Sequence, residues 1–226
     1  MVRSLGFEVT RHLQYEEECM MGRPVSYEQT DVLRQAAQLF RFRGFRSVTV
    51  QSIVEATGLN RFAIYEKFGG KEGLFYAALE FYVEVPVKQD LLREFRTGQP
   101  GLGELLALLD DMRAKSLHPD APAGCLIINA SIELGGKDER VEQIVGDFSQ
   151  AMKDAFMIAL SGSQGRGELI EGRPVEDRAD YLVTMINAFM VLAHVSRESA
   201  DQLMRAVIDE VRCWRRGRPG FTAVSA

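Results

Sequence analysis

The chain has 226 residues, of which 46% are hydrophobic and 26% charged, and its net charge at pH 7 is −5. That length allows one or two domains with a sizeable core. No apolar run approaches the ~20 residues that a membrane helix needs, and three glutamates at 16–18 stand where a signal peptide would be apolar. We therefore expect a globular cytoplasmic protein with no membrane partner.

The cysteines and histidines predict neither a metal centre nor a disulfide framework. Cys19, Cys125 and Cys213 are far apart and odd in number, and the three histidines stand alone. No nucleophile elbow, zinc-protease motif, P-loop or dinucleotide fingerprint occurs. We therefore expect a protein that is not an enzyme and that has no cofactor and no bound metal.

Residues 1–21 form an N-terminal extension without a clear helical period, with two arginines against four glutamates. Two explanations stay open for this segment. Either translation starts at Met21, or the extension is a short helix that lies against the rest of the protein.

The first clear helix follows this extension. Ser26 and Gln29 have the spacing of a capping box, and Gly44 is placed to close the helix. Between them runs a wide apolar stripe of Val32, Leu33, Ala36, Ala37, Leu39 and Phe40.

Two short helices joined by a tight turn come next. Thr49 is placed to cap a helix that runs to about Thr57, Gly58 supplies the positive φ that ends it, and Asn60 caps the next helix. A pair of helices with such a turn is the unit that places its second helix in the major groove of DNA. The sequence therefore predicts a helix-turn-helix.

The faces of the second helix support this interpretation. Ile64 and Phe68 share one face and must be buried, while the rest of the helix points outward or lies on its flanks: Arg61, Phe62, Ala63, Tyr65, Glu66 and Lys67. Outward aromatic side chains make sense if this surface has a partner. The alternative is a small helical core with incidental surface aromatics.

Charge is distributed unevenly along the chain. Residues 30–71 contain seven basic and three acidic residues, a balance of +4, so the rest of the chain carries −9. A basic segment on an acidic protein is typical of a DNA reader whose other part has a different task.

At this point the residues resemble a known family. Residues 22–75 contain A-x-x-L-F ending at Phe40, then G-F, A-T-G-L, I-Y-x-x-F and K-E-x-L-F. This run resembles the N-terminal domain of TetR/AcrR-type bacterial transcription regulators. The G-R-P start at Gly22 and the run G-C-L-x-x-N-x-x-x-E from Gly124 to Glu133 resemble one large branch of that family. Gly70 departs from the pattern, since a better capping residue usually precedes K-E.

Roles at the DNA follow from position, and the family pattern agrees with them. Thr49, Tyr65 and Lys71 suit phosphate oxygens, which fix register without reading sequence. Base contacts are expected from the start of the second helix, where Arg61 suits guanine and Phe62 and Ala63 suit thymine methyl groups. The full predicted DNA-binding set is Thr49, Asn60, Arg61, Phe62, Ala63, Tyr65, Lys67 and Lys71.

The remainder of the chain, residues 76–216, reads as helices with short breaks, followed by a loose tail at 217–226. A fourth helix is expected over about 71–82, with a break at Pro86. Further helices are expected near 87–96, 102–117, 125–134, 138–160, 175–196 and 199–214. The predicted fold is all-α, with a three-helix helix-turn-helix head and a C-terminal helical bundle for ligand binding and dimerisation.

Two sets of apolar residues in this bundle have predicted roles. An interior rich in Phe and Met suits an adaptable ligand pocket, although each residue taken alone reads as ordinary core: Phe95, Met112, Cys125, Phe148, Met152, Phe156, Phe189, Met190 and His194. The last two helices carry more apolar surface than one chain is expected to cover. The resemblance implies that they pair with a second copy of the chain through Leu182, Met185, Ile186, Leu203, Val207, Val211 and Trp214.

The leading hypothesis is a homodimeric repressor that an unidentified small molecule releases from a palindromic operator in double-stranded DNA. A second is a redox- or electrophile-sensing regulator that acts through Cys125, which opens a helix, although a small buried side chain is the simpler interpretation. A third is an architectural DNA-binding protein without an inducer.

Overall fold

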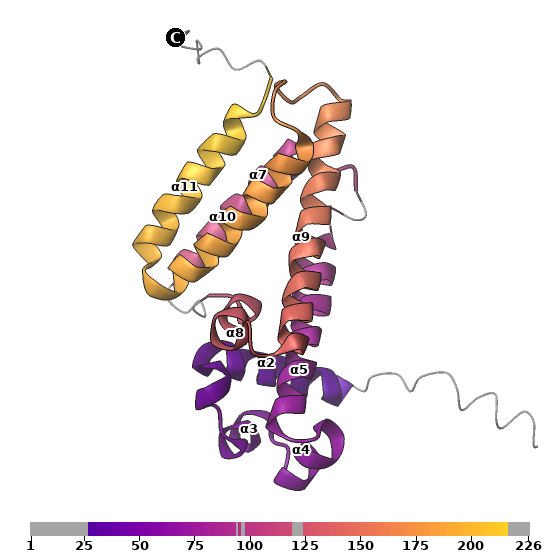
Figure 1. Ribbon diagram of the computed structural model, residues 1–226, viewed down its shortest axis with the longest axis vertical. Coiled ribbons are helices and arrows are strands. Elements are labelled where there is room, and N and C mark those ends of the chain that lie inside the picture. Colours follow the sequence, from indigo (N-terminus) through magenta and orange to yellow (C-terminus); the bar gives the residue numbers. More distant parts are fainter. Residues whose placement is uncertain (1–26, 94, 96–97, 119–123, 217–226) are drawn as a thin grey trace, which may run out of the picture.

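Figure 1 shows an elongated helical molecule with a small head at one end and a longer body. The computed structural model describes residues 27–93, 95, 98–118 and 124–216, so the predictions for the N-terminal extension, the Ser26 capping box and the tail lie outside it. The head contains α2 (Tyr27–Ser47), α3 (Val50–Thr57) and α4 (Arg61–Phe68), and α5 (Lys71–Tyr82) joins it to the body. The body contains η1 (Val83–Leu91), α7 (Leu102–Leu117), α8 (Leu126–Leu134), α9 (Glu139–Gly165), α10 (Val175–Val195) and α11 (Arg197–Cys213).

The head is held by a small apolar core at the crossing of its helices with α5. Phe40, Ile53, Ile64 and Phe75 are each at most 1% exposed, and the rings of Phe40 and Phe75 meet edge to face with centroids 5.0 Å apart. Gly44 breaks the helical path of α2 with a φ of 73°, as predicted, although a last turn continues to Ser47. The helices α3 and α4 lie at the end of the molecule that is opposite α11 and the end of α10 (Figure 1).

The predicted break at Pro86 is wrong. The chain passes from α5 directly into η1, a π-helical turn in which the Leu92 amide donates to the Val87 carbonyl at 2.8 Å. Proline lacks the amide hydrogen that a regular α-helix uses, and a wider π-helical turn is one way a helix continues through such an interruption. Head and body are therefore joined by continuous helical backbone.

The predicted end of the long helix near Leu160 is also wrong, because α9 continues to Gly165. Gly162 serves for close packing: a Cβ built there would lie 2.7 Å from the Pro100 carbonyl oxygen. The next residue, Ser163, accepts a hydrogen bond from the Leu102 amide at 2.7 Å and so satisfies the first turn of α7. This end of α9 therefore fixes where α7 begins.

The last two helices bury more of their apolar surface within one chain than the sequence suggested. They pack on each other, α11 also packs on α7, and α10 packs on α9 (Figure 1). Five of the seven predicted dimer residues are at most 3% exposed: Leu182, Ile186, Val207, Val211 and Trp214. Only Met185 and Leu203 are half-buried. The premise that a single chain cannot cover both faces is therefore wrong.

Two structural features are absent from the part of the chain that the structure describes. No helix there is both long enough and apolar enough to cross a membrane. The same residues contain no group of three or more His, Cys, Asp or Glu side chains that could hold a metal ion.

Candidate nucleic-acid interface

The turn between α3 and α4 is built from local hydrogen bonds that the sequence predicted. The Thr49 hydroxyl accepts from the Ser52 amide at 3.1 Å, and the Ser52 hydroxyl accepts from the Thr49 amide at 2.9 Å, which forms a reciprocal capping box. Gly58 ends α3 with a φ of 69°, and the Asn60 side chain accepts from the Ala63 amide at 2.8 Å to begin α4. Both helices therefore have fixed starting points, which sets the angle between them.

The faces of α4 follow the prediction at most positions, although Phe68 is less buried than predicted. Ile64 is fully buried and Phe68 is half-buried, whereas the side chains of Phe62 and Tyr65 are 74% and 59% exposed. Arg61, Glu66 and Lys67 are also exposed. Ala63 differs, because it is half-buried rather than fully outward. The exposed face of α4 is thus aromatic at its centre and charged at its flanks.

Two side-chain hydrogen bonds connect Arg61 of α4 with Gln51 and Glu55 of α3, and they were not predicted from the sequence. Arg61 donates through Nη2 to Oε1 of Gln51 at 3.2 Å, and Gln51 donates through Nε2 to Oε1 of Glu55 at 2.9 Å. Gln51 and Glu55 are four residues apart, a spacing that brings them onto one helix face. That spacing was the only available signal, since the partner Arg61 lies on another helix. These hydrogen bonds hold the Arg61 side chain on the exposed face of α4, beside Phe62.

Lys71 is placed by the end of α2. Its ammonium lies 4.4 Å from the centroid of the Phe45 ring and 3.5 Å from the Arg46 carbonyl oxygen. A cation above an aromatic face is attracted to it, so this contact holds Lys71 at the start of α5.

The structure explains why glycine occupies position 70, where a capping residue is usual. Its φ is 109°, and a Cβ built there would lie 3.1 Å from Cε1 of Tyr65. Glycine at this position therefore allows the Tyr65 ring to pack over the backbone between α4 and α5. The helix α5 has no side-chain cap in consequence.

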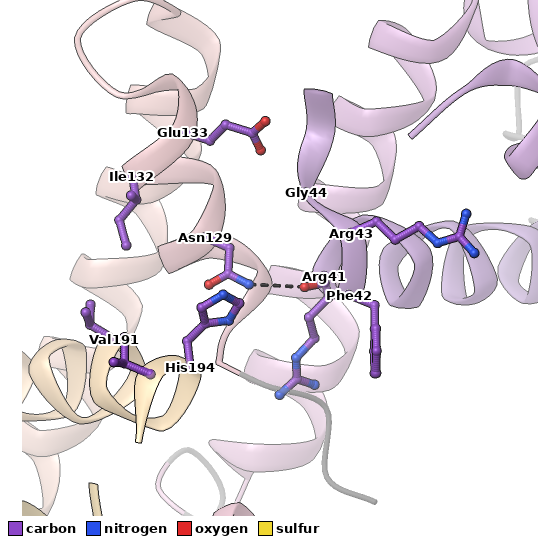
Figure 2. A pocket seen from close by; sticks show the side chains of 10 residues that line it. Arg41, Phe42, Arg43, Gly44, Asn129, Ile132, Glu133, Val191 and His194 are labelled. Carbon is purple, nitrogen blue, oxygen red and sulfur yellow. Dashed lines mark hydrogen bonds between the residues drawn. The ribbon is translucent and has the colours of Figure 1, made fainter. Parts of the chain in front are cut away.

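The structure does not bring all the predicted pocket residues together. Seven of them lie in the continuous hydrophobic core of the body: Phe95, Met112, Cys125, Phe148, Met152, Phe156 and Phe189. Met190 is half-buried against that core. His194 instead lines a cleft of about 440 Å³ between α2, α8 and α10, which Figure 2 shows at close range. The other eight residues do not line this cleft.

Cys125 is buried at the N-terminal cap of α8, where its side chain is 4% exposed. It lies beside Tyr82, and burial followed by the neighbouring Cys125 thiol raises the pKa of the Tyr82 hydroxyl above its ordinary value. Cys213 is exposed on α11, and Cys19 lies outside the described residues.

Comparison with known proteins agrees with this geometry. Residues 32–78 match the model of "Bacterial regulatory proteins, tetR family", and residues 101–207 match "Tetracyclin repressor-like, C-terminal domain". The HTH-type transcriptional repressor ComR of Escherichia coli is 26% identical over 85% of this chain and 91% of its own length. The repressor AcnR of Corynebacterium efficiens is 25% identical over 84% and 95%.

Solved structures share the fold. A TetR-family regulator from Cytophaga hutchinsonii superimposes with a TM-score of 0.71 and 19% identity over 84% of this chain and 96% of its own. A cysteine mutant of the TetR-family regulator CifR, complexed with 26-base-pair operator DNA, has a TM-score of 0.69 and 21% identity over 83% and 98%. The two family models between them cover both the head and the body, and the chain belongs to the TetR family of bacterial regulatory proteins.

Proposed function

We propose that this protein is a homodimeric transcriptional repressor that binds a palindromic operator and is released from it by a small molecule. The observation that carries the proposal is the exposed face of α4. Phe62 and Tyr65 lie on a helix whose start, end and inner face are all fixed by the fold, yet their own side chains are mostly exposed. A solvated helix avoids such a surface, and a helix that enters the major groove uses it to contact base edges and methyl groups.

Membership of the TetR family supports DNA binding and repression as the activity, and it gives no support to an enzymatic one. The relatives ComR and AcnR are named as repressors, and the CifR mutant is described with operator DNA. Double-stranded DNA is therefore the partner that this function requires. The cytoplasm is the compartment in which a bacterial protein meets it.

Dimerisation follows from the need to read a palindrome. Two heads held about 34–36 Å apart contact successive major grooves on one side of the duplex. The faces of α10 and α11 that their own chain does not cover are the candidate interface, to which the half-buried Met185 and Leu203 are expected to contribute apolar contacts. Leu203→Glu is expected to weaken self-association in sedimentation experiments. Leu106→Glu, at a half-buried leucine on α7, is the control and is expected to leave it unchanged.

The body is the part of the protein in which the releasing small molecule is expected to bind. The Phe- and Met-rich core of the body can repack around a small apolar molecule. A ligand that lowers operator affinity a thousandfold must favour the released conformation by about 4 kcal/mol. That amount lies within reach of a single well-buried ligand.

The decisive experiment is selection of DNA from random sequence with the purified protein at a stated salt concentration. One palindrome is expected, and Arg61→Ala and Phe62→Ala are expected to lose it. Salt matters because phosphate contacts make the affinity fall steeply with ionic strength. Recovery of DNA without a common sequence would refute the specific repressor and favour an architectural protein instead.

The redox alternative has a specific observation behind it, since the Cys125 thiol lies at the start of α8 beside the Tyr82 hydroxyl. Reactive cysteines are partly exposed, whereas the Cys125 side chain is 4% exposed, so burial counts against a sensor. Cys125→Ser separates the two functions. An oxidant response that disappears in this variant, while operator binding stays, would establish the sensor. An unchanged response would assign Cys125 to the core.

A further inference from the structure

Three residues of one sequence motif in the body all contact the end of α2 in the head. Arg41 donates through Nε to the Gly124 carbonyl oxygen at 2.8 Å, and its Nη2 reaches the same oxygen. Asn129 on α8 returns a hydrogen bond through Nδ2 to the Arg41 carbonyl oxygen at 3.1 Å, the dashed line in Figure 2. Glu133, one turn further along α8, faces the same end of α2 (Figure 2).

The Glu133 carboxylate is bound by two consecutive backbone amides of the head. The Phe45 amide donates to Oε2 and the Arg46 amide donates to Oε1, each at 2.7 Å. These amides are available because Gly44 leaves the helical path, so they no longer point along α2. Successive amides in such a turn form a concave anion-binding site. Here that site is filled by a carboxylate from the body.

Two glycines make this arrangement possible. Gly44 has a φ of 73°, and a Cβ built there would lie 3.0 Å from Oε2 of Glu133. Gly124 has a φ of 70°, and its Cβ would lie 3.0 Å from Oδ1 of Asn129. Any other residue at either position would strain the backbone and crowd the polar side chain that crosses the junction. We call the set Arg41, Gly44, Gly124, Asn129 and Glu133 the junction clamp.

The junction clamp is a set of polar contacts, whereas most of the packing between helices is apolar. It consists of directional hydrogen bonds, part-buried apart from the exposed one of the Arg46 amide, and Arg41, Asn129 and Glu133 also line the solvent-accessible cleft of Figure 2. The apolar core, by contrast, runs without a break from the head into the body. Charge-assisted bonds of this type fix orientation strongly for the small area they occupy.

The clamp also leads to the proposed DNA-binding surface. Phe45 and Arg46, whose amides bind Glu133, are the two residues that contact the Lys71 ammonium. Val50, four residues after Arg46, begins α3. A movement of α8 would therefore shift Phe45 and Arg46 through the hydrogen bonds of Glu133. These two residues would in turn shift Lys71 through their contacts with its ammonium, and the start of α3 through the backbone.

We propose that the junction clamp sets the orientation of the head on the body and transmits movements of α8 to operator affinity, with Glu133 and Asn129 as positioning residues. This inference rests on the proposed function, because it concerns operator binding. It also assigns a task to the motif from Gly124 to Glu133, whose polar members are otherwise unexplained. Asn129 and Glu133 are spaced i, i+4, which puts both on one face of α8.

The test compares Glu133→Ala and Glu133→Gln with Glu142→Gln in the full-length protein. Glu142 is the matched control, because it accepts from the Gly136 amide at 2.7 Å just beyond α8 and that bond does not involve the head. Operator affinity is expected to fall about tenfold in Glu133→Ala and less in Glu133→Gln, which keeps one acceptor oxygen. Glu142→Gln is expected to bind as the wild type does. Hydrogen exchange of the peptide that contains the Phe45 and Arg46 amides should accelerate in Glu133→Ala alone.

Two outcomes of this test would overturn the inference, and a third would refute the proposed function. Accelerated exchange with operator affinity within twofold of the wild type would overturn the inference, because the clamp would then form without controlling binding. Unchanged exchange would show that the clamp does not form in solution and would also overturn it. A wild-type protein that selects no operator would instead refute the proposed function, while the exchange measurement would still report on the clamp.

A second pair of variants tests the same point if Glu133→Ala does not fold. Gly44→Ala should weaken operator binding as Glu133→Ala does, because it crowds the Glu133 carboxylate. Gly167→Ala is its control, since Gly167 has a similar φ of 69° and open space around its Cβ position. Equal operator affinities in these two variants would contradict the proposal.

Discussion

Replacing Phe62 with alanine should separate DNA binding from stability. The Phe62 side chain is 74% exposed in the free protein, so its truncation removes little buried surface. The neighbours that hold α4 in place, Asn60 at its start and Ile64 on its inner face, remain intact. The variant should therefore fold normally and present the same surface without its central aromatic ring.

The expected magnitudes follow from this exposure. An exposed substitution away from caps and ion pairs changes the free energy of unfolding by no more than about 0.5 kcal/mol. On DNA, a lost base contact costs about 1 kcal/mol at the low end of the usual range. A dimer loses that contact twice, so operator affinity should fall by about 2 kcal/mol, or roughly thirtyfold.

Phe42 provides the matched control. It is 73% exposed, on α2 rather than on α4, so Phe42→Ala removes an equally exposed phenylalanine. Fluorescence anisotropy with the selected operator measures binding, and urea denaturation measures stability. Phe62→Ala should lose affinity and Phe42→Ala should not. Equal affinities for the two variants, or a loss of stability above ~2 kcal/mol in Phe62→Ala, would refute the assignment of this face.

Three further predictions concern the fold. Asn60→Ala removes the cap of α4 and should cost about 1 kcal/mol in urea denaturation, with weaker operator binding; an unchanged midpoint would contradict the capping role. Tyr76→Phe removes a hydrogen bond to Asp138 of 2.6 Å and should cost about 1 kcal/mol at neutral pH. The Tyr76 hydroxyl holds the pKa of the Asp138 carboxyl below its usual 3.8, so this stabilisation is present above about pH 4 and is lost as the pH falls through the lowered pKa. Titrations of the two proteins should therefore converge in acid, and a constant difference would argue against the ionised carboxylate as the acceptor. Arg178→Ala should cost about 2–4 kcal/mol in the same assay, because it leaves a cavity beside Trp214 and an unpaired Ile170 carbonyl; a loss below ~1 kcal/mol would mean that the site collapses without penalty.

The head could be predicted from the sequence because its signals are local. The capping box joins Thr49 to Ser52, three residues away, and Gly58 and Asn60 each act on their nearest neighbours. The burial of Ile64 follows from helical spacing alone. Propensity, capping and periodicity agree over this segment, so nothing distant was needed to choose between alternatives.

The errors in the body arise where a distant partner decides the outcome. The helix predicted over 138–160 continues through Gly162, where the nearby carbonyl oxygen of Pro100 requires a residue without a side chain. Glu133 was recognised only as the last residue of the motif from Gly124, and its partners are the amides of Phe45 and Arg46, 88 and 87 residues away along the chain. No local pattern carries that information.

The last two helices show the same limit for burial. Periodicity in α10 and α11 gives the width of an apolar face but not which helix covers it. In the structure Leu182, Val207 and Val211 are buried within one chain, where α10 packs on α9 and α11 packs on α7, so fewer of the predicted residues are left to contact a second copy. Met185 and Leu203 are half-buried in the single chain and therefore remain available to a second copy. Leu203→Glu is therefore a sharper probe of dimerisation than a substitution at any of the five buried residues, because those substitutions would also disturb the core of the single chain.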